Sequence, residues 1–123
     1  MDLPGAWRAA FSRRYRDVDV AEAERLLSAG AVLLDVRDAW EWQAGRAPGA
    51  RHIPLAALPG RLAELPTDRP VVVICRSGNR SAAAAALLAR TGRTAVNLAG
   101  GMRAWAAAGH PVVADGGRPG SVA

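Results

Sequence analysis

Short runs of branched apolar residues alternate along the chain with segments whose apolar positions recur every three or four residues. Apolar segments typical of strands lie at 31–36, 71–74 and 94–98, and a short strand is also expected at 15–18. Capping residues, helical spacing and helix-favouring composition predict helices at 19–30, 39–44, 55–64, 81–90 and 102–108. This alternation predicts an α/β domain with a mainly parallel central sheet flanked by helices on both faces.

Glycine and proline divide the chain further. A Pro-Gly pair weakens or splits the helix expected at 55–64. The apolar spacing near the N-terminus favours an extension at 1–14 that is helical, and the Gly-rich end at 114–123 is expected to be a flexible tail. The domain itself is therefore expected to span 15–113.

Composition narrows the class of protein. The 123 residues suit one domain, and the net charge of +5 comes from sixteen arginines that are mostly scattered and not interleaved with aromatic residues, so we expect no nucleic-acid partner. No apolar run approaches the roughly 20 residues of a membrane span, and no secretory signal is evident, so we expect no membrane partner and a cytoplasmic location. One cysteine and two distant histidines predict neither a disulfide nor a metal site.

The lone cysteine, Cys75, follows the strand at 71–74 in the stretch V-V-V-I-C-R-S-G-N-R-S. A helix is expected to begin near Ser81, and its first backbone N–H groups have no partners inside the helix, so they can face an anion. Gly78 lets the loop curl around the sulfur, while Arg76 and Arg80 add positive charge. These features favour a reactive thiolate over the alternative, a small apolar residue buried at a strand end.

Loop length bears on what such a thiolate attacks. The spacing here is C-x4-R, whereas cysteine phosphatases use C-x5-R to surround a tetrahedral phosphoryl group. A shorter ring of amides suits a single sulfur atom attached to the cysteine. The loop therefore favours sulfur transfer over phosphate hydrolysis.

Four motifs in register resemble the rhodanese family, the single-domain thiosulfate sulfurtransferases. The resemblance runs from about Tyr15 to Val113 and rests on L-L-D-V-R, E-W-Q-A-G-R-A-P-G-A-R-H-I-P, C-R-S-G-N-R-S and L-A-G-G-M-R-A-W. It implies a rhodanese-like fold. One departure stands out, because Arg46 and Ala47 replace the His-Ile pair usual in the family, and no general base is assigned there.

The resemblance also implies a role for each matching residue. Cys75 takes the sulfane sulfur as a persulfide, cradled by the backbone amides of the substrate-binding loop, which comprises Arg76, Ser77, Gly78, Asn79 and Arg80. Asp35 and Arg37 match a pair beside the cleft and are expected to be structural, as an ion pair or an anchor at a strand end. Glu41 matches an acidic position near the cleft, and a solvated helix carboxylate is the alternative.

The implied activity is transfer of sulfur from thiosulfate, or another sulfane-sulfur donor, through Cys75 to cyanide or a thiol, without a cofactor. Arg76 and Arg80 would attract the dianionic donor. Because the chain has one cysteine, the acceptor has to be external: a small thiol, thioredoxin or a sulfur-acceptor protein. The alternatives are a persulfide carrier or binding module with little turnover and, less favoured, a cysteine-dependent phosphatase or an arsenate reductase.

Overall fold

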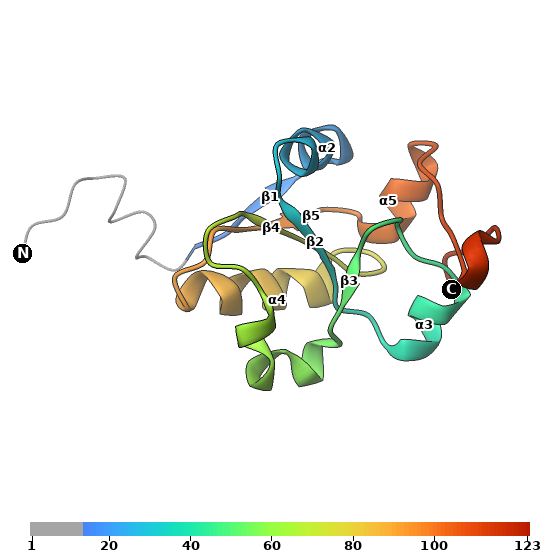
Figure 1. Ribbon diagram of the computed structural model, residues 1–123. Helices are drawn as coiled ribbons and strands as arrows, with labels where there is room; N and C mark the ends of the chain where they lie inside the picture. The colour runs from blue at the N-terminus through green and yellow to red at the C-terminus, as the bar shows by residue number, and fades with distance from the viewer. Residues whose placement is uncertain (1–13) are drawn as a thin grey trace, which may run out of the picture.

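Five parallel strands form the central sheet of the computed structural model, which describes residues 14–123 (Figure 1). The strands are β1 (Arg16–Val18), β2 (Val32–Asp35), β3 (Arg51–His52), β4 (Val71–Ile74) and β5 (Ala95–Leu98). Their order is β1-β5-β4-β2-β3, and every pair in it is parallel, which confirms the predicted fold class. The helical extension expected at 1–14 lies outside the described part except for its last residue.

Helices cover both faces of the sheet, as predicted (Figure 1). One face packs against α2 (Val20–Ser28) and α5 (Gly101–Ala107), and the other against α4 (Asn79–Arg90) and the 3-10 helices η1 (Leu55–Gly60) and η2 (Leu62–Glu64). The short helix α3 (Ala39–Ala44) and the 3-10 turn η3 (Asp115–Gly117) lie near each other at one side of the molecule.

The central strand β4 shows why its sequence is a continuous apolar run. Alternate side chains of a strand point to opposite faces, so Val71 and Val73 enter the core beneath α4, while Val72 and Ile74 enter the core beneath α2 and α5. All four are fully buried. A strand covered on both faces has no polar side, and this places the following residue, Cys75, at the middle of one edge of the sheet.

The predicted elements agree with the structure except at a few ends. The Pro-Gly pair divides 55–64 into η1 and η2, as expected. Helix α4 begins at Asn79, two residues earlier than predicted, so Asn79 and Arg80 lie in its first turn. The two-residue strand β3 is not among the predicted elements, because its pairing with β2 depends on a distant strand and leaves no local periodicity.

The C-terminal segment, residues 114–123, was expected to be a flexible tail, but the structure places it against the body of the domain. The N–H of Ser121 donates to the carbonyl of Ala44 at 2.9 Å, and Val122 packs on the core. The main chain comes so close that a Cβ on Gly120 would meet backbone atoms at 2.8 Å. Main-chain contacts of this kind leave no pattern in the sequence.

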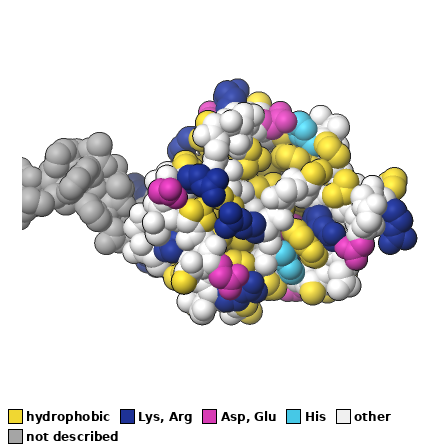
Figure 2. All heavy atoms as spheres, viewed as in Figure 1, with side chains coloured by type: hydrophobic (Ala, Val, Ile, Leu, Met, Phe, Trp, Pro, Cys, Tyr) yellow, Lys and Arg dark blue, Asp and Glu magenta, His cyan; other side chains and the backbone are white. Residues whose placement is uncertain are grey.

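The surface agrees with the composition. On the face shown in Figure 2, arginine side chains are dispersed among apolar and acidic ones and do not gather into one patch. Within residues 14–123, no helix is both long and apolar enough to cross a membrane. The same residues contain no group of three His, Cys, Asp or Glu side chains arranged to hold a metal ion.

Candidate active site

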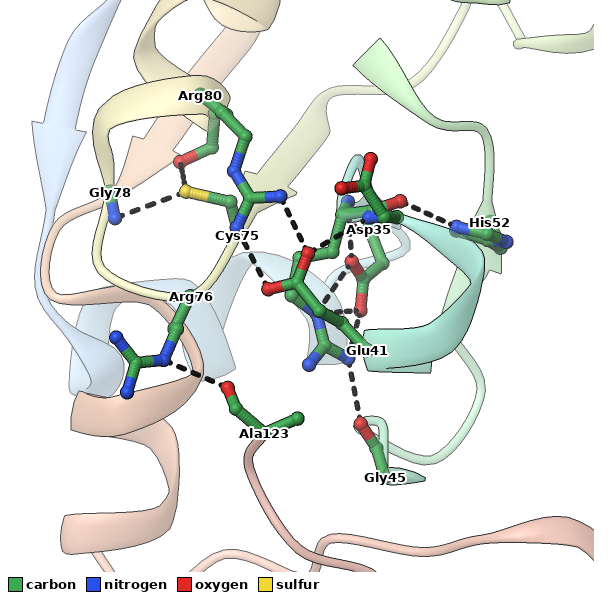
Figure 3. A network of polar contacts seen from close by, with 12 residues as sticks. Asp35, Glu41, Gly45, His52, Cys75, Arg76, Gly78, Arg80 and Ala123 are labelled. Atoms are coloured by element: carbon green, nitrogen blue, oxygen red, sulfur yellow. Dashed lines mark hydrogen bonds and ion pairs between the residues drawn. The ribbon is translucent and has the colours of Figure 1, made fainter. Parts of the chain in front are cut away.

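Cys75 lies directly after β4, where the chain turns through a short loop into α4. Ligands of parallel α/β sheets bind beyond this carboxyl edge, at the loops that lead into helices. The side chain is buried, and its sulfur accepts hydrogen bonds from the Gly78 N–H at 3.1 Å and the Ser81 hydroxyl at 3.2 Å (Figure 3). Gly78 adopts a φ of 111°, which lets the loop bring its amide back to the sulfur.

Two opposing effects set the acidity of this thiol. Burial raises the pKa of Cys75, because it removes water from around the charged form. Hydrogen bonds from the Ser81 hydroxyl and from the backbone amides of Ser81, Gly78 and Ser77 act in the other direction and prevail, so the pKa of the thiol lies below its ordinary value. The geometry therefore supports a thiolate nucleophile.

The start of α5 holds the other side of the cysteine loop. The N–H groups of Met102 and Arg103 donate to the carbonyls of Cys75 and Arg76 at 2.7 and 3.1 Å. Gly101 makes this possible, because a Cβ there would meet the carbonyl of Cys75 and lie 2.6 Å from backbone atoms of Arg76. The backbone around the sulfur is thus fixed from two helices.

Arg80 is not a free charge beside the sulfur. Its Nη1 and Nη2 donate to the two carboxylate oxygens of Glu41 at 2.6 and 2.9 Å (Figure 3). Glu41 is only 3% exposed, so it is not a solvated helix carboxylate. The bond from Arg80 holds the pKa of Glu41 below its usual value and raises the pKa of Arg80. Hydrogen bonds, more than arginine charge, therefore stabilise the thiolate.

Comparison with known proteins agrees with this arrangement. The rhodanese-like domain family matches residues 19–108, which include the sheet edge, the cysteine loop and the start of α5. The chain belongs to the rhodanese family. The match confirms the resemblance drawn from the four sequence motifs.

Similar proteins align with most of this rhodanese domain. A sulfurtransferase of Allochromatium vinosum is 44% identical over 97 residues, which cover 77% of this chain and 91% of the relative. The thiosulfate sulfurtransferase GlpE of Pseudomonas savastanoi pv. phaseolicola is 35% identical, with 76% and 89% covered. The crystal structure of a rhodanese-related protein from Thermoplasma volcanium superposes with a TM-score of 0.75 at 35% identity, covering 80% of this chain and 98% of that one.

Asp35 and Arg37 form the ion pair that the sequence suggested. Both side chains are fully buried, and the guanidinium of Arg37 donates to both oxygens of Asp35 and to the carbonyl of Gly45 at 2.7 Å. The ring of His52 lies 2.7 Å from the carbonyl of Arg37 and stacks on Trp42. These contacts join the end of β2 to α3, the helix that carries Glu41.

Arg46, which replaces the family's usual histidine, connects the rhodanese domain to its C-terminal segment. Its Nη2 donates to Asp115 at 2.7 Å, and its backbone exchanges two hydrogen bonds of 2.9 Å with Val113. Its guanidinium also lies over the ring of Trp42, 4.8 Å from the centroid. Ala47, the second departure, is a buried core residue.

The C-terminal segment reaches the cysteine loop. Nε of Arg76 donates to the carbonyl of Ala123 at 2.8 Å, so the last residues lie beside the loop (Figure 3). The side chain of Arg76 is exposed, and it forms no ion pair with any described residue. Of the two loop arginines, Arg76 is therefore the one whose charge remains available to a ligand.

Sequence reasoning missed three residues of this site: Ser81, which contacts the sulfur, Asn97, which contacts Ser81, and Gly101, which contacts the backbone of the loop. Ser81 was noted only as a helix start, and its hydroxyl also contacts the buried side chain of Asn97 at 2.6 Å. A polar residue inside the apolar strand T-A-V-N-L was the signal for Asn97. The Gly-Gly pair of the L-A-G-G-M motif was the signal for Gly101.

Proposed function

We propose that this rhodanese domain is a sulfurtransferase that carries a sulfane sulfur on Cys75. The observation that carries the proposal is the buried sulfur at the carboxyl edge of β4, which accepts hydrogen bonds from Gly78 and Ser81 and has a lowered pKa. A thiolate is the nucleophilic form of cysteine, and these donors stabilise it.

The chemistry is a two-step exchange. The Cys75 thiolate attacks the outer sulfur of thiosulfate, the sulfur–sulfur bond of thiosulfate breaks, and sulfite leaves with the bonding electron pair. The persulfide anion that remains is then attacked at its outer sulfur by cyanide or a thiolate, which takes that sulfur and restores the Cys75 thiolate. Each step moves one uncharged sulfur atom between two anionic nucleophiles, so no oxidant or cofactor is needed.

Loop residues have assignable parts in this exchange. Asn79 and Arg80 lie in the first turn of α4, where backbone N–H groups have no partner within the helix, and these can receive the anionic outer sulfur. Arg76 offers an exposed guanidinium for the dianionic donor, because it forms no ion pair within residues 14–123 and only its Nε donates to Ala123. Ser77 contributes its amide to the stability of the thiolate.

Thiosulfate is the proposed donor because a relative of similar length carries the name thiosulfate sulfurtransferase. The acceptor is external, since the chain has one cysteine: cyanide in the assay, and a small thiol, thioredoxin or another sulfur-acceptor protein in the cell. The cytoplasm is the proposed compartment, because it keeps acceptor thiols reduced.

Steady-state kinetics test this proposal. With thiosulfate and cyanide, the wild-type protein should form thiocyanate with parallel double-reciprocal lines, the pattern of a substituted-enzyme mechanism. Cys75→Ser should form none. Thiocyanate formation by that variant, or release of phosphate from an aryl phosphate by the wild type, would contradict the proposal. A persulfide that forms but turns over poorly would favour the carrier alternative.

A further inference from the structure

One hydroxyl group beside the active cysteine faces two acceptors. The Ser81 Oγ lies 3.2 Å from the Cys75 sulfur and 2.6 Å from Oδ1 of Asn97. A serine hydroxyl carries a single hydrogen, so it can donate to only one of them at a time. The state of the sulfur and the hydrogen bond to Asn97 are therefore linked.

The carboxamide of Asn97 is held in one orientation. Asn97 lies on β5, the strand beside β4, and is 4% exposed. Its Nδ2 donates one hydrogen to the Gly78 carbonyl at 3.2 Å and the other to Asp17 at 2.9 Å. Both amide hydrogens are thus committed, and Oδ1 is turned toward Ser81, its only donor among residues 14–123.

Each state of Cys75 places the Ser81 hydrogen differently. A neutral thiol donates its own hydrogen to Ser81, which in turn donates to Asn97, so every group is satisfied. A thiolate has no hydrogen and accepts the one from Ser81, which leaves the buried Oδ1 of Asn97 without a donor, an arrangement that costs free energy. In a persulfide the negative charge lies on the outer sulfur, the inner sulfur becomes a weak acceptor, and Ser81 can return to Asn97.

We propose that Asn97 is a positioning residue that competes with the Cys75 sulfur for the Ser81 hydroxyl. Through this competition it favours the thiol and the sulfur-loaded cysteine over the free thiolate. The part that concerns the persulfide rests on the proposed function; the competition in the unloaded protein does not.

Charged groups also lie on the elements around the cysteine loop, and the test has to separate their effect from that of Asn97. They come from the loop and α4, from α3, from the end of β2 and from β1: Arg76, Arg80, Glu41, Asp35, Arg37 and Asp17. Among them, Asp17 contacts Asn97 directly. The variant Asp17→Asn removes its charge, keeps an oxygen that can accept from Asn97, and serves as the matched control.

The first experiment measures the alkylation rate of Cys75 by iodoacetamide against pH, in wild type, Asn97→Leu, Ser81→Ala and the double variant. Asn97→Leu removes the competing acceptor, so the thiol pKa should fall and alkylation in the acidic range should become about tenfold faster. Ser81→Ala removes the donor and should raise the pKa. The double variant should have the same thiol pKa as Ser81→Ala alone. The control Asp17→Asn should have the thiol pKa of the wild type.

A merely structural role for Asn97 predicts a different pattern. If Asn97 only anchors the loop through Gly78, Asn97→Leu will shift the pH profile of alkylation by the same amount in the wild type and in Ser81→Ala. That result would overturn the proposal. An unchanged or raised pKa in Asn97→Leu would do the same.

A second measurement on the wild type covers the case in which Asn97→Leu does not fold. The side-chain carbonyl carbon of Asn97 should shift in the NMR spectrum as Cys75 is titrated, and not in Ser81→Ala. No shift in the wild type would refute the competition. Alkylation needs no sulfur donor, so these results stand apart from any failure of sulfur transfer itself.

Discussion

Gly101 is the residue where a single added carbon most directly disturbs the active cysteine. It adopts a φ of 55° at the start of α5, and its Cα faces the backbone of Cys75 and Arg76. In Gly101→Ala the new Cβ would lie 2.6 Å from two atoms of Arg76, whereas ordinary contacts begin at 3.4 Å. The carbonyl of Cys75 would lie closer still, so the loop and the helix would have to separate by about 1 Å.

The loss of stability expected in Gly101→Ala has two parts, and the control variant Gly109→Ala measures one of them separately. Alanine in the left-handed region costs about 1–2 kcal/mol at any site. Gly109, with a φ of 87° and no atom within 4 Å of its added Cβ, carries that part alone. Gly101→Ala adds the strain of the contact and a weakened Met102–Cys75 hydrogen bond, for a total of about 2–4 kcal/mol.

Thermal or urea unfolding of both variants gives the stability, and thiocyanate formation gives the activity. Since a misplacement of about 1 Å can cost about 10²-fold in rate, Gly101→Ala should lose activity on that order, whereas Gly109→Ala should keep nearly all of it. Equal stability losses with full activity in both would refute the claim that the close approach at Gly101 positions the sulfur.

Other predictions follow from the ion pairs and the C-terminal contact. Arg76→Ala should raise the KM for thiosulfate without changing the free energy of unfolding. Arg80→Ala should lower the free energy of unfolding, because it leaves the buried carboxylate of Glu41 unpaired. Equal effects of the two variants on KM and on stability would contradict this assignment. Glu41→Gln should lower the free energy of unfolding at pH 7 by about 1–2 kcal/mol, a value reduced for the partial exposure of Arg80. Because the folded-state pKa of Glu41 is lowered, this difference should persist above the unfolded pKa of about 4.3 and disappear as the pH falls through the folded pKa; unfolding from pH 2 to 7 checks it. Arg46→Ala should loosen the C-terminal segment and thereby release Arg76 from Ala123. The KM for thiosulfate should then fall about twofold. An unchanged or higher KM would show that the contact between Arg76 and Ala123 does not limit binding of the donor.

The sequence predicted features that depend on local pattern. Buried strands such as 71–74 and the split near Pro59 appear in the structure because apolar runs and helix breakers act over a few residues. The cysteine loop was found because a lone thiol, a glycine and a helix start stand together in the chain.

Features that depend on distant partners were not predicted. The pairing of Arg80 with Glu41 joins residues 39 positions apart, and of the expected sources of thiolate stability it weakens the charge of Arg80 and leaves the loop hydrogen bonds. The contact of Ser81 with Asn97 and the packing of residues 114–123 against the domain likewise arise only when separate strands and helices meet. No local periodicity records such contacts.

Intact-protein mass spectrometry before and after exposure to thiosulfate tests the central claim most directly. The wild type should gain the mass of one sulfur atom, cyanide should remove it with formation of thiocyanate, and Cys75→Ser should gain nothing. A wild-type protein that gains no sulfur from thiosulfate or from any other persulfide donor would show that Cys75 does not carry a sulfane sulfur.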